Sequence, residues 1–119
     1  MKTKVLEKYL LSKKYATKEF PFGPDVAVFK VMNKMFALVA TEEGLLRISL
    51  KSDPDEALIL RSTFKAVQPG YHMNKEHWNT VTLDGSIPKD VVLNMIDDSY
   101  HLVVKGLKKA DRLKLDIQE

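Results

Sequence analysis

The chain has 119 residues, of which 45% are hydrophobic and 29% charged, and its formal net charge is +3. These proportions are typical of one globular domain and exclude an intrinsically disordered chain. The absence of cysteine excludes disulfide scaffolds, thiol catalysis and cysteine-based zinc sites, and it fits the reducing cytoplasm. We expect a cytoplasmic protein, because no apolar run approaches the roughly 18 residues of a membrane span and no small-residue cleavage site follows the N-terminus.

The positive charge is concentrated near the two ends of the sequence. Residues 1–18 contain six lysines and one glutamate, and residues 105–114 contain four lysines, one arginine and one aspartate. Residues 19–104 hold 8 basic and 12 acidic residues, so the middle is net negative. Solvated helix faces produce the same distribution, so the net charge only slightly favours an acidic partner.

The first half of the chain predicts a helix, a turn and three strands. Apolar residues at helical spacing predict a helix over Lys4–Lys14, with Thr3 as a possible N-cap. Two prolines and a glycine predict a turn over Phe20–Asp25. Three short apolar runs, separated by Asn33-Lys34 and by Thr41–Gly44, then predict an antiparallel meander: Val26–Met32, Met35–Ala40 and Leu45–Leu50.

The second half predicts a helix, one strand and a long final helix. Asp53 and Pro54 are a typical helix start, and the helix Pro54–Phe64 is expected to direct Ala57, Leu58, Leu60 and Phe64 to the core. A strand over Trp78–Leu83 and a helix from Pro88 to about Leu107, with Ser86 as a possible cap, complete the domain.

We therefore expect one α+β domain over residues 1–112 and a C-terminal tail over 113–119. Its antiparallel sheet should have helices packed on one face, and the pattern leaves the strand order open.

Strand alternation gives the first functional indication. Lys30, Arg47, Lys51 and Trp78 fall on strand faces opposite the apolar residues, so they could converge on the open side of the sheet. A basic surface with an aromatic residue suits phosphates and a stacked base. The alternative is an ordinary solvated sheet face on which the tryptophan fills a gap in the packing.

The polar segment Pro69–Thr80 holds two of the three histidines and the only tryptophan. His72 and His77 are five residues apart, which is not a typical metal-ligand spacing, and His101 lies far away on the last helix. No nucleophile motif, glycine-rich phosphate loop or other catalytic pattern occurs, so we expect no enzyme, metal or cofactor. The segment instead suggests binding: the lysine can meet a phosphate, the asparagines can hydrogen-bond and the rings can stack, through Asn74, Lys75, His77, Trp78 and Asn79.

Several motifs resemble those of one known family and occur in the same order: Pro21-Phe22-Gly23-Pro24-Asp25, Val28-Phe29-Lys30-Val31, Lys34-Met35-Phe36-Ala37, Leu50-Lys51-Ser52-Asp53-Pro54, Pro69-Gly70-Tyr71-His72-Met73-Asn74-Lys75-Glu76-His77-Trp78-Asn79-Thr80-Val81, Leu83-Asp84-Gly85-Ser86 and Ser99-Tyr100-His101-Leu102-Val103. From about Leu6 to Arg112 the chain resembles the MmcQ/YjbR family of small bacterial proteins. The resemblance implies a fold like that of CyaY, the bacterial frataxin homologue, and DNA binding through a double-wing motif. Ser52 stands where many members carry cysteine, which argues against a thiol-dependent role.

Our leading hypothesis is a DNA-binding protein that uses a basic and aromatic surface. Combining the alternation and the resemblance, the candidate residues are Lys30, Lys34, Arg47, Lys51, His72, Asn74, Lys75, His77, Trp78 and Asn79. The alternative is an adaptor that binds an acidic protein or a small ligand through the same surface, without catalysis. We expect a monomer or weak dimer with no membrane association. Frataxin-type iron binding is not expected, because it uses an acidic ridge and Glu7 is the only acid of the first helix.

Overall fold

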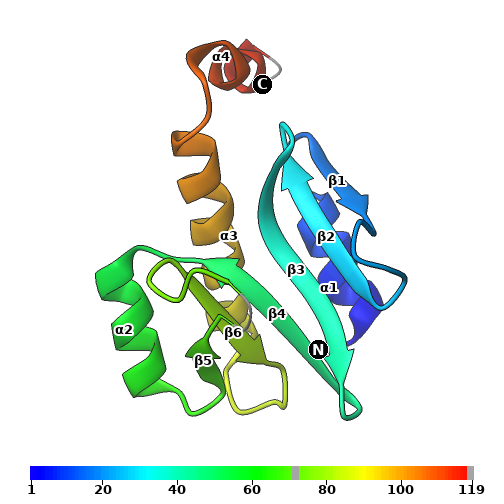
Figure 1. Ribbon diagram of the computed structural model, residues 1–119, viewed down its shortest axis with the longest axis vertical. Helices are drawn as coiled ribbons and strands as arrows, with labels where there is room; N and C mark the ends of the chain where they lie inside the picture. The colour runs from blue at the N-terminus through cyan, green and yellow to red at the C-terminus, as the bar shows by residue number, and fades with distance from the viewer. Residues whose placement is uncertain (71–72, 118–119) are drawn as a thin grey trace.

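The computed structural model describes residues 1–70 and 73–117, which form one antiparallel sheet and several helices (Figure 1). In the described part of the chain the strands are β1 Ala16–Glu19, β2 Val26–Val31, β3 Lys34–Glu42, β4 Leu45–Lys51, β5 Val67–Pro69 and β6 Trp78–Thr82. The helices are α1 Thr3–Leu11, α2 Pro54–Thr63, α3 Lys89–Lys105 and α4 Lys109–Ile117. None of the helices in these ranges is long and apolar enough to cross a membrane.

The strands lie in the order β1-β2-β3-β4-β6-β5, and each neighbouring pair is antiparallel. The β2–β3 hairpin turns at Met32-Asn33, and the β3–β4 hairpin turns at Glu43-Gly44. All four of these residues have positive φ, which is the conformation that two-residue hairpins require. The first turn therefore lies one residue earlier than the predicted Asn33-Lys34, and Met32 belongs to the turn instead of the strand.

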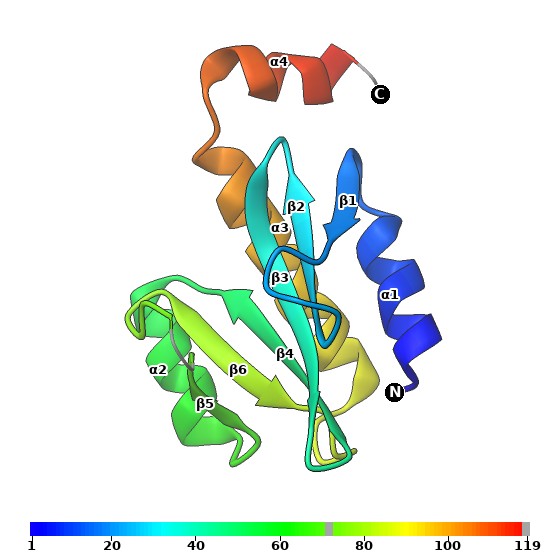
Figure 2. The same cartoon turned by 45° about the vertical axis from the view of Figure 1, so that its right-hand side comes forward.

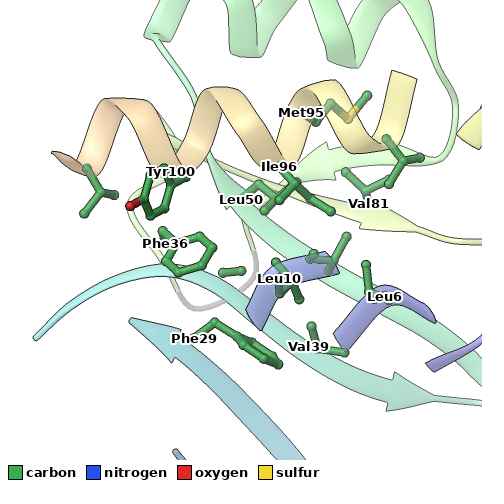
Figure 3. Packing of buried hydrophobic residues seen from close by; sticks show 14 of the residues in the cluster. Leu6, Leu10, Phe29, Phe36, Val39, Leu50, Val81, Met95, Ile96 and Tyr100 are labelled. Atoms are coloured by element: carbon green, nitrogen blue, oxygen red, sulfur yellow. The ribbon is translucent and has the colours of Figure 1, made fainter. Parts of the chain in front are cut away.

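Helices α1 and α3 pack against one face of the sheet, and the hydrophobic core lies between them and the strands (Figures 1 and 2). Figure 3 shows this packing, in which α1 contributes Leu6 and Leu10. The rings of Phe36 on β3 and Tyr100 on α3 meet edge to face, with centroids 5.3 Å apart. The predicted α+β fold, with helices on one face of an antiparallel sheet, is confirmed.

Two strands and one helix are additional to the predicted elements. β1 and β5 are short and carry few apolar residues, so they form only because they pair with the neighbouring strands β2 and β6. α4 follows the end of α3 at Gly106 and lies beyond the β2–β3 turn in Figures 1 and 2. The region expected to be a tail from residue 113 is therefore helical as far as Ile117, and Leu115 is buried.

The helix starts also differ from the predictions at two positions. α1 begins at Thr3 itself, after Lys2, and α3 begins after Pro88, so neither Thr3 nor Ser86 is the N-cap. Ser86 instead donates hydrogen bonds from its amide and its hydroxyl to Asp84 Oδ1. Asp53 does precede α2 as predicted, although its side chain makes no capping bond. In α2, Leu58 is 60% exposed, so its predicted place in the core is wrong.

Candidate nucleic-acid interface

The open face of the sheet, opposite α1 and α3, carries the residues that alternation placed there. In β4 and β6 the alternate residues Ile48, Leu50 and Val81 are buried in the core. The other set therefore faces away from the helices, and Lys51 and Trp78 lie directly opposite each other in the β4–β6 register. The backbone fixes this neighbourhood, since paired residues in adjacent strands project side by side.

The four candidate residues of the open face do not converge on one point. Arg47 pairs with Thr82 and lies four residues from Lys51, which is roughly 13 Å at the usual rise of a strand. Lys30 is on β2, separated from β4 by β3. The open face therefore has a Lys51–Trp78 region at one end of β4 and an Arg47 region toward the other.

Acidic neighbours compensate two of the predicted cations. Lys30 Nζ lies 2.8 Å from Glu19 Oε2, and Arg47 Nη1 lies 2.7 Å from Glu42 Oε2. Within residues 1–70 and 73–117, no ion pair involves Lys34, Lys51 or Lys75. No acidic side chain of the described residues therefore neutralises these three lysines.

Four of the predicted residues line one hollow, which we call the β4-end hollow. Its volume is about 370 Å³, and it is formed where β4 ends and β6 begins. Its lining consists of Lys51, Ser52, Asp53, Pro54, Asn74, His77, Trp78 and Leu102. Lys51 thus lies beside three other predicted residues, Asn74, His77 and Trp78, which are more than twenty positions further along the chain.

Backbone hydrogen bonds hold the loop residues of this hollow in place. The amide of Ser52 donates to His77 O at 2.7 Å, and the amide of Trp78 donates to Asn74 O at 2.9 Å. Asn74 Oδ1 accepts a hydrogen bond from the amide of Glu76 at 2.9 Å, so the Asn74 side chain shapes the loop as well as lining the hollow. Arg61 donates to Lys75 O, which ties the loop to α2 while the Lys75 side chain remains exposed.

The remaining candidates lie elsewhere. Asn79 is 2% exposed, and both ends of its amide are engaged: Nδ2 donates to Ala57 O at 3.2 Å, and Oδ1 accepts from Arg61 Nε at 2.6 Å. Alternation places Asn79 on the same face as Val81, which is the signal that it points into the protein. Lys34 begins β3 beside the β2–β3 turn and does not line the hollow, and His72 lies outside the described residues.

Sequence reasoning missed an apolar groove on the open face. It has a volume of about 520 Å³ and is lined by Phe22, Val26, Met35, Leu38, Ala40, Glu42, Arg47, Ser49, Met73 and Thr80. We call it the sheet groove. The signal was present, because the alternation that exposes Lys30 places Val28 on the same side. Val28 is 1% exposed even though it faces away from the helices, so this face is not simply solvated.

No group of three or more histidine or acidic side chains lies close enough to hold a metal ion in the part of the chain that the structure describes. One cluster of charged and polar side chains lies on the helical side of the sheet. There Asp97 of α3 accepts hydrogen bonds from Tyr9 Oη at 2.6 Å and from Lys13 Nζ, far from the candidate residues. This cluster joins helices and takes no part in the candidate interface.

The fold is that of a small α+β protein with an open antiparallel sheet and helices on one face, and in this chain a polar and aromatic hollow lies at the sheet end. The family model of YjbR matches residues 11–102. The chain therefore belongs to the YjbR family.

Its relatives share most of the chain. Uncharacterized protein YbdF of Escherichia coli O157:H7 is 41% identical over 96 residues, which cover 81% of this chain and 79% of that protein. Uncharacterized protein YjbR of Escherichia coli K12 is 40% identical over 89 residues, 75% of each chain. Among solved structures, the DUF419-domain protein DR2400 of Deinococcus radiodurans superposes with a TM-score of 0.84 at 40% identity, covering 93% of this chain and 85% of that one. A Pseudomonas syringae protein superposes with a TM-score of 0.77 at 30% identity, covering 86% and 98%.

Proposed function

We propose that the protein binds nucleic acid, and single-stranded DNA in preference to duplex, through the β4-end hollow. The observation that carries this proposal is that Lys51, Asn74, His77 and Trp78, from two separate stretches of sequence, line one hollow. Two lysines that form no ion pair among the described residues, Lys51 in the hollow and Lys75 beside it, supply positive charge, and Asp53 is the acidic residue of the lining.

The chemistry of the hollow favours an unpaired nucleotide. Lysine ammonium groups bind phosphates as point charges, and an indole or imidazole ring offers a face on which a base stacks. A base inside a duplex already has both faces covered by its neighbours, so stacking on Trp78 or His77 requires an unpaired base. The amide of Asn74 adds a group that can hydrogen-bond to a base edge or to the backbone.

The deciding experiment measures fluorescence anisotropy of a labelled oligothymidylate and of a labelled duplex at increasing salt. We expect tighter binding of the single strand, with log affinity falling by about 0.7 per log unit of salt for each neutralised phosphate. Lys51→Ala and Lys75→Ala should each reduce this slope by about that amount. Lys89→Ala, which removes the same charge from the exposed start of α3, is the matched control and should bind normally.

Trp78→Ala should weaken binding of the single strand by about 1–3 kcal/mol without changing the salt slope, because stacking releases no counterions. Trp78→Phe should retain part of the affinity, and circular dichroism would verify that both variants are folded.

Inorganic polyphosphate distinguishes DNA binding from the adaptor alternative, because polyphosphate is acidic but has no base. If polyphosphate binds as tightly as the oligonucleotide, and its affinity is unchanged in Trp78→Ala, the acidic-partner alternative is correct. Absence of saturable DNA binding at about 50 mM salt would refute the proposal.

A further inference from the structure

We propose that the sheet groove is a second binding site, which takes a small apolar molecule ending in a carboxylate held by Arg47. This site is separate from the β4-end hollow, and the two have none of their lining residues in common. The proposal rests on the size and lining of the groove and on an unpartnered donor within it.

The sheet groove has the dimensions of a small-molecule site. Its volume of about 520 Å³ lies within the range of ligand pockets, which are mostly apolar with a few polar groups. Strands β2 and β3 supply its apolar floor, and Phe22 from the β1–β2 connection and Met73 from the loop before β6 supply walls. In Figure 2 the β1–β2 connection passes in front of the sheet, on the side away from α3.

The apolar floor is not required by the fold. The open face of an antiparallel sheet with helices on the other side is usually polar, since water covers it. Here the floor is formed by Val26, Leu38 and Ala40, and Phe22 at the rim is 70% exposed. The two methionine side chains, Met35 and Met73, are flexible and adapt to ligands of irregular shape.

The polar groups of the groove leave one donor without a partner. Ser49 Oγ and Thr80 Oγ1 lie 2.9 Å apart and share a hydrogen bond. Arg47 Nη1 donates a hydrogen bond to Glu42 Oε2, but Arg47 Nε is buried and has no hydrogen-bond partner. Buried donors are nearly always satisfied in native proteins, so Arg47 Nε is a donor that a bound acceptor would satisfy.

Arg47 determines the chemistry of the missing acceptor. A guanidinium binds a carboxylate more strongly than any neutral oxygen and can hold it through Nε and a terminal nitrogen together. Arg47 is the only basic residue that lines the described groove, and Glu42 occupies one of its nitrogens. The groove offers a single cation, Arg47, which already pairs with Glu42, so it lacks the row of basic residues that a polyanion such as DNA requires. A ligand with one carboxylate and an apolar body fits both features, because the carboxylate accepts from Arg47 Nε and the apolar body packs on the floor of the groove.

The experiment follows the methyl resonances of ¹³C-methionine-labelled protein during titration with decanoate, and in parallel with decanol. Met35 and Met73 line the groove, whereas Met95 of α3 is buried in the core and serves as the internal control. We expect Met35 and Met73 to shift and saturate at one ligand per chain, with Met95 unchanged. Decanoate should bind about tenfold more tightly than decanol, because only the acid forms the charged pair with Arg47.

Arg47→Gln should abolish the preference for the acid while leaving decanol binding unchanged. Arg112→Gln, an exposed arginine on α4, is the matched control and should retain the preference. Ala40→Phe, which fills the groove, should remove both ligands, and Phe22→Ala at the exposed rim should weaken both without endangering the fold. Shifts at Met95 alone, or an unchanged acid preference in Arg47→Gln, would overturn the proposal. Groove shifts that depend on protein concentration without ligand would do so too, because a second copy would then fill the groove.

Discussion

At the scale of single residues, Gly70 shows how closely the loop before β6 approaches the strand that it precedes. Its amide donates to Trp78 O at 2.8 Å, and a Cβ added at Gly70 would lie 2.8 Å from Trp78 Cβ and 3.0 Å from Trp78 O. Real Cβ atoms essentially never approach so closely, and backbone atoms cannot give way. The position of the Trp78 backbone beside Lys51 therefore depends on the absence of a side chain at Gly70.

We expect Gly70→Ala to destabilise the protein by about 1–3 kcal/mol, the usual cost of forcing an extra carbon into a packed site. Trp78 is the only tryptophan, so its fluorescence should also change in the folded state. Urea denaturation measures the first effect, and emission spectra measure the second. Gly106→Ala is the control, since its nearest atoms would lie 3.6 Å away and its φ is negative. Equal stability of the two variants would contradict this account.

At the scale of elements, α2 joins the sheet through a small apolar contact, to which Ala57 and Leu60 contribute, and through polar contacts with β6. Ala57 is its only buried residue, and Leu58 and Ile59 are 60% and 55% exposed. Asn79 of β6 compensates for this weak apolar packing, since it donates to Ala57 O and accepts from Arg61 Nε. The buried Asn79 side chain therefore attaches α2 to β6, which is a structural role and not a ligand-binding one.

Asn79→Ala should cost about 2–3 kcal/mol, because it removes the hydrogen bonds to Ala57 O and from Arg61 Nε and leaves a cavity at a buried position. The loss should be concentrated in α2, so hydrogen exchange of its amides should accelerate more than that of α3 amides. Asn94→Ala on the exposed side of α3 is the matched control and should change little. Normal exchange in α2 of the Asn79 variant would show that apolar contacts suffice.

At the scale of the whole molecule, the cluster of Tyr9, Lys13 and Asp97 links the N-terminal segment to α3 and makes stability depend on pH. Burial alone raises the pKa of Asp97, but hydrogen bonds from Lys13 and Tyr9 and the charge of Lys13 outweigh it, so its net pKa lies below 3.8. The hydrogen bond to Asp97, with burial, raises the pKa of Tyr9. Burial lowers the pKa of Lys13, but its bond to Asp97 and the charge of Asp97 raise it overall.

The sign of each shift gives the pH window. Asp97 contributes stability above its unfolded pKa, and this is lost as pH falls through the lower folded value. Tyr9 and Lys13 contribute stability at pH values below their unfolded pKa values, which lie near 10. This stability is lost as the pH rises through their higher folded pKa values. Asp97→Asn should lower the unfolding free energy at neutral pH by about 1–2 kcal/mol, given partial exposure, and should flatten both limbs of the profile.

Thermal melts between acidic and alkaline pH measure this effect. Asp98→Asn is the matched control, because Asp98 is exposed and makes no ion pair among the described residues. An acid limb unchanged in the Asp97 variant would mean that other carboxylates govern the acid transition.

Features that depend on neighbours along the chain could be predicted from the amino-acid sequence. Helical spacing predicted α1, α2 and α3 to within a few residues, and period-two alternation assigned Lys51 and Trp78 to one face and Leu50 to the other. These patterns are local, because each side chain's direction follows from the backbone geometry of its own element. The family resemblance is likewise a property of the sequence, since the motif of Pro69–Val81 carries most of it.

Which distant residues lie side by side depends on the folded arrangement of the strands and loops. That β6 lies between β4 and β5 placed Trp78 opposite Lys51, and that β1 pairs with β2 brought Glu19 to neutralise Lys30. The sheet groove exists because the β1–β2 connection and the loop before β6 stand on either side of an apolar floor. Strand order and loop packing are set by the cooperative burial of surface between segments far apart in sequence, and no local pattern encodes that balance. The charges were therefore visible in the sequence, but which of them remain free for a ligand was settled by folding.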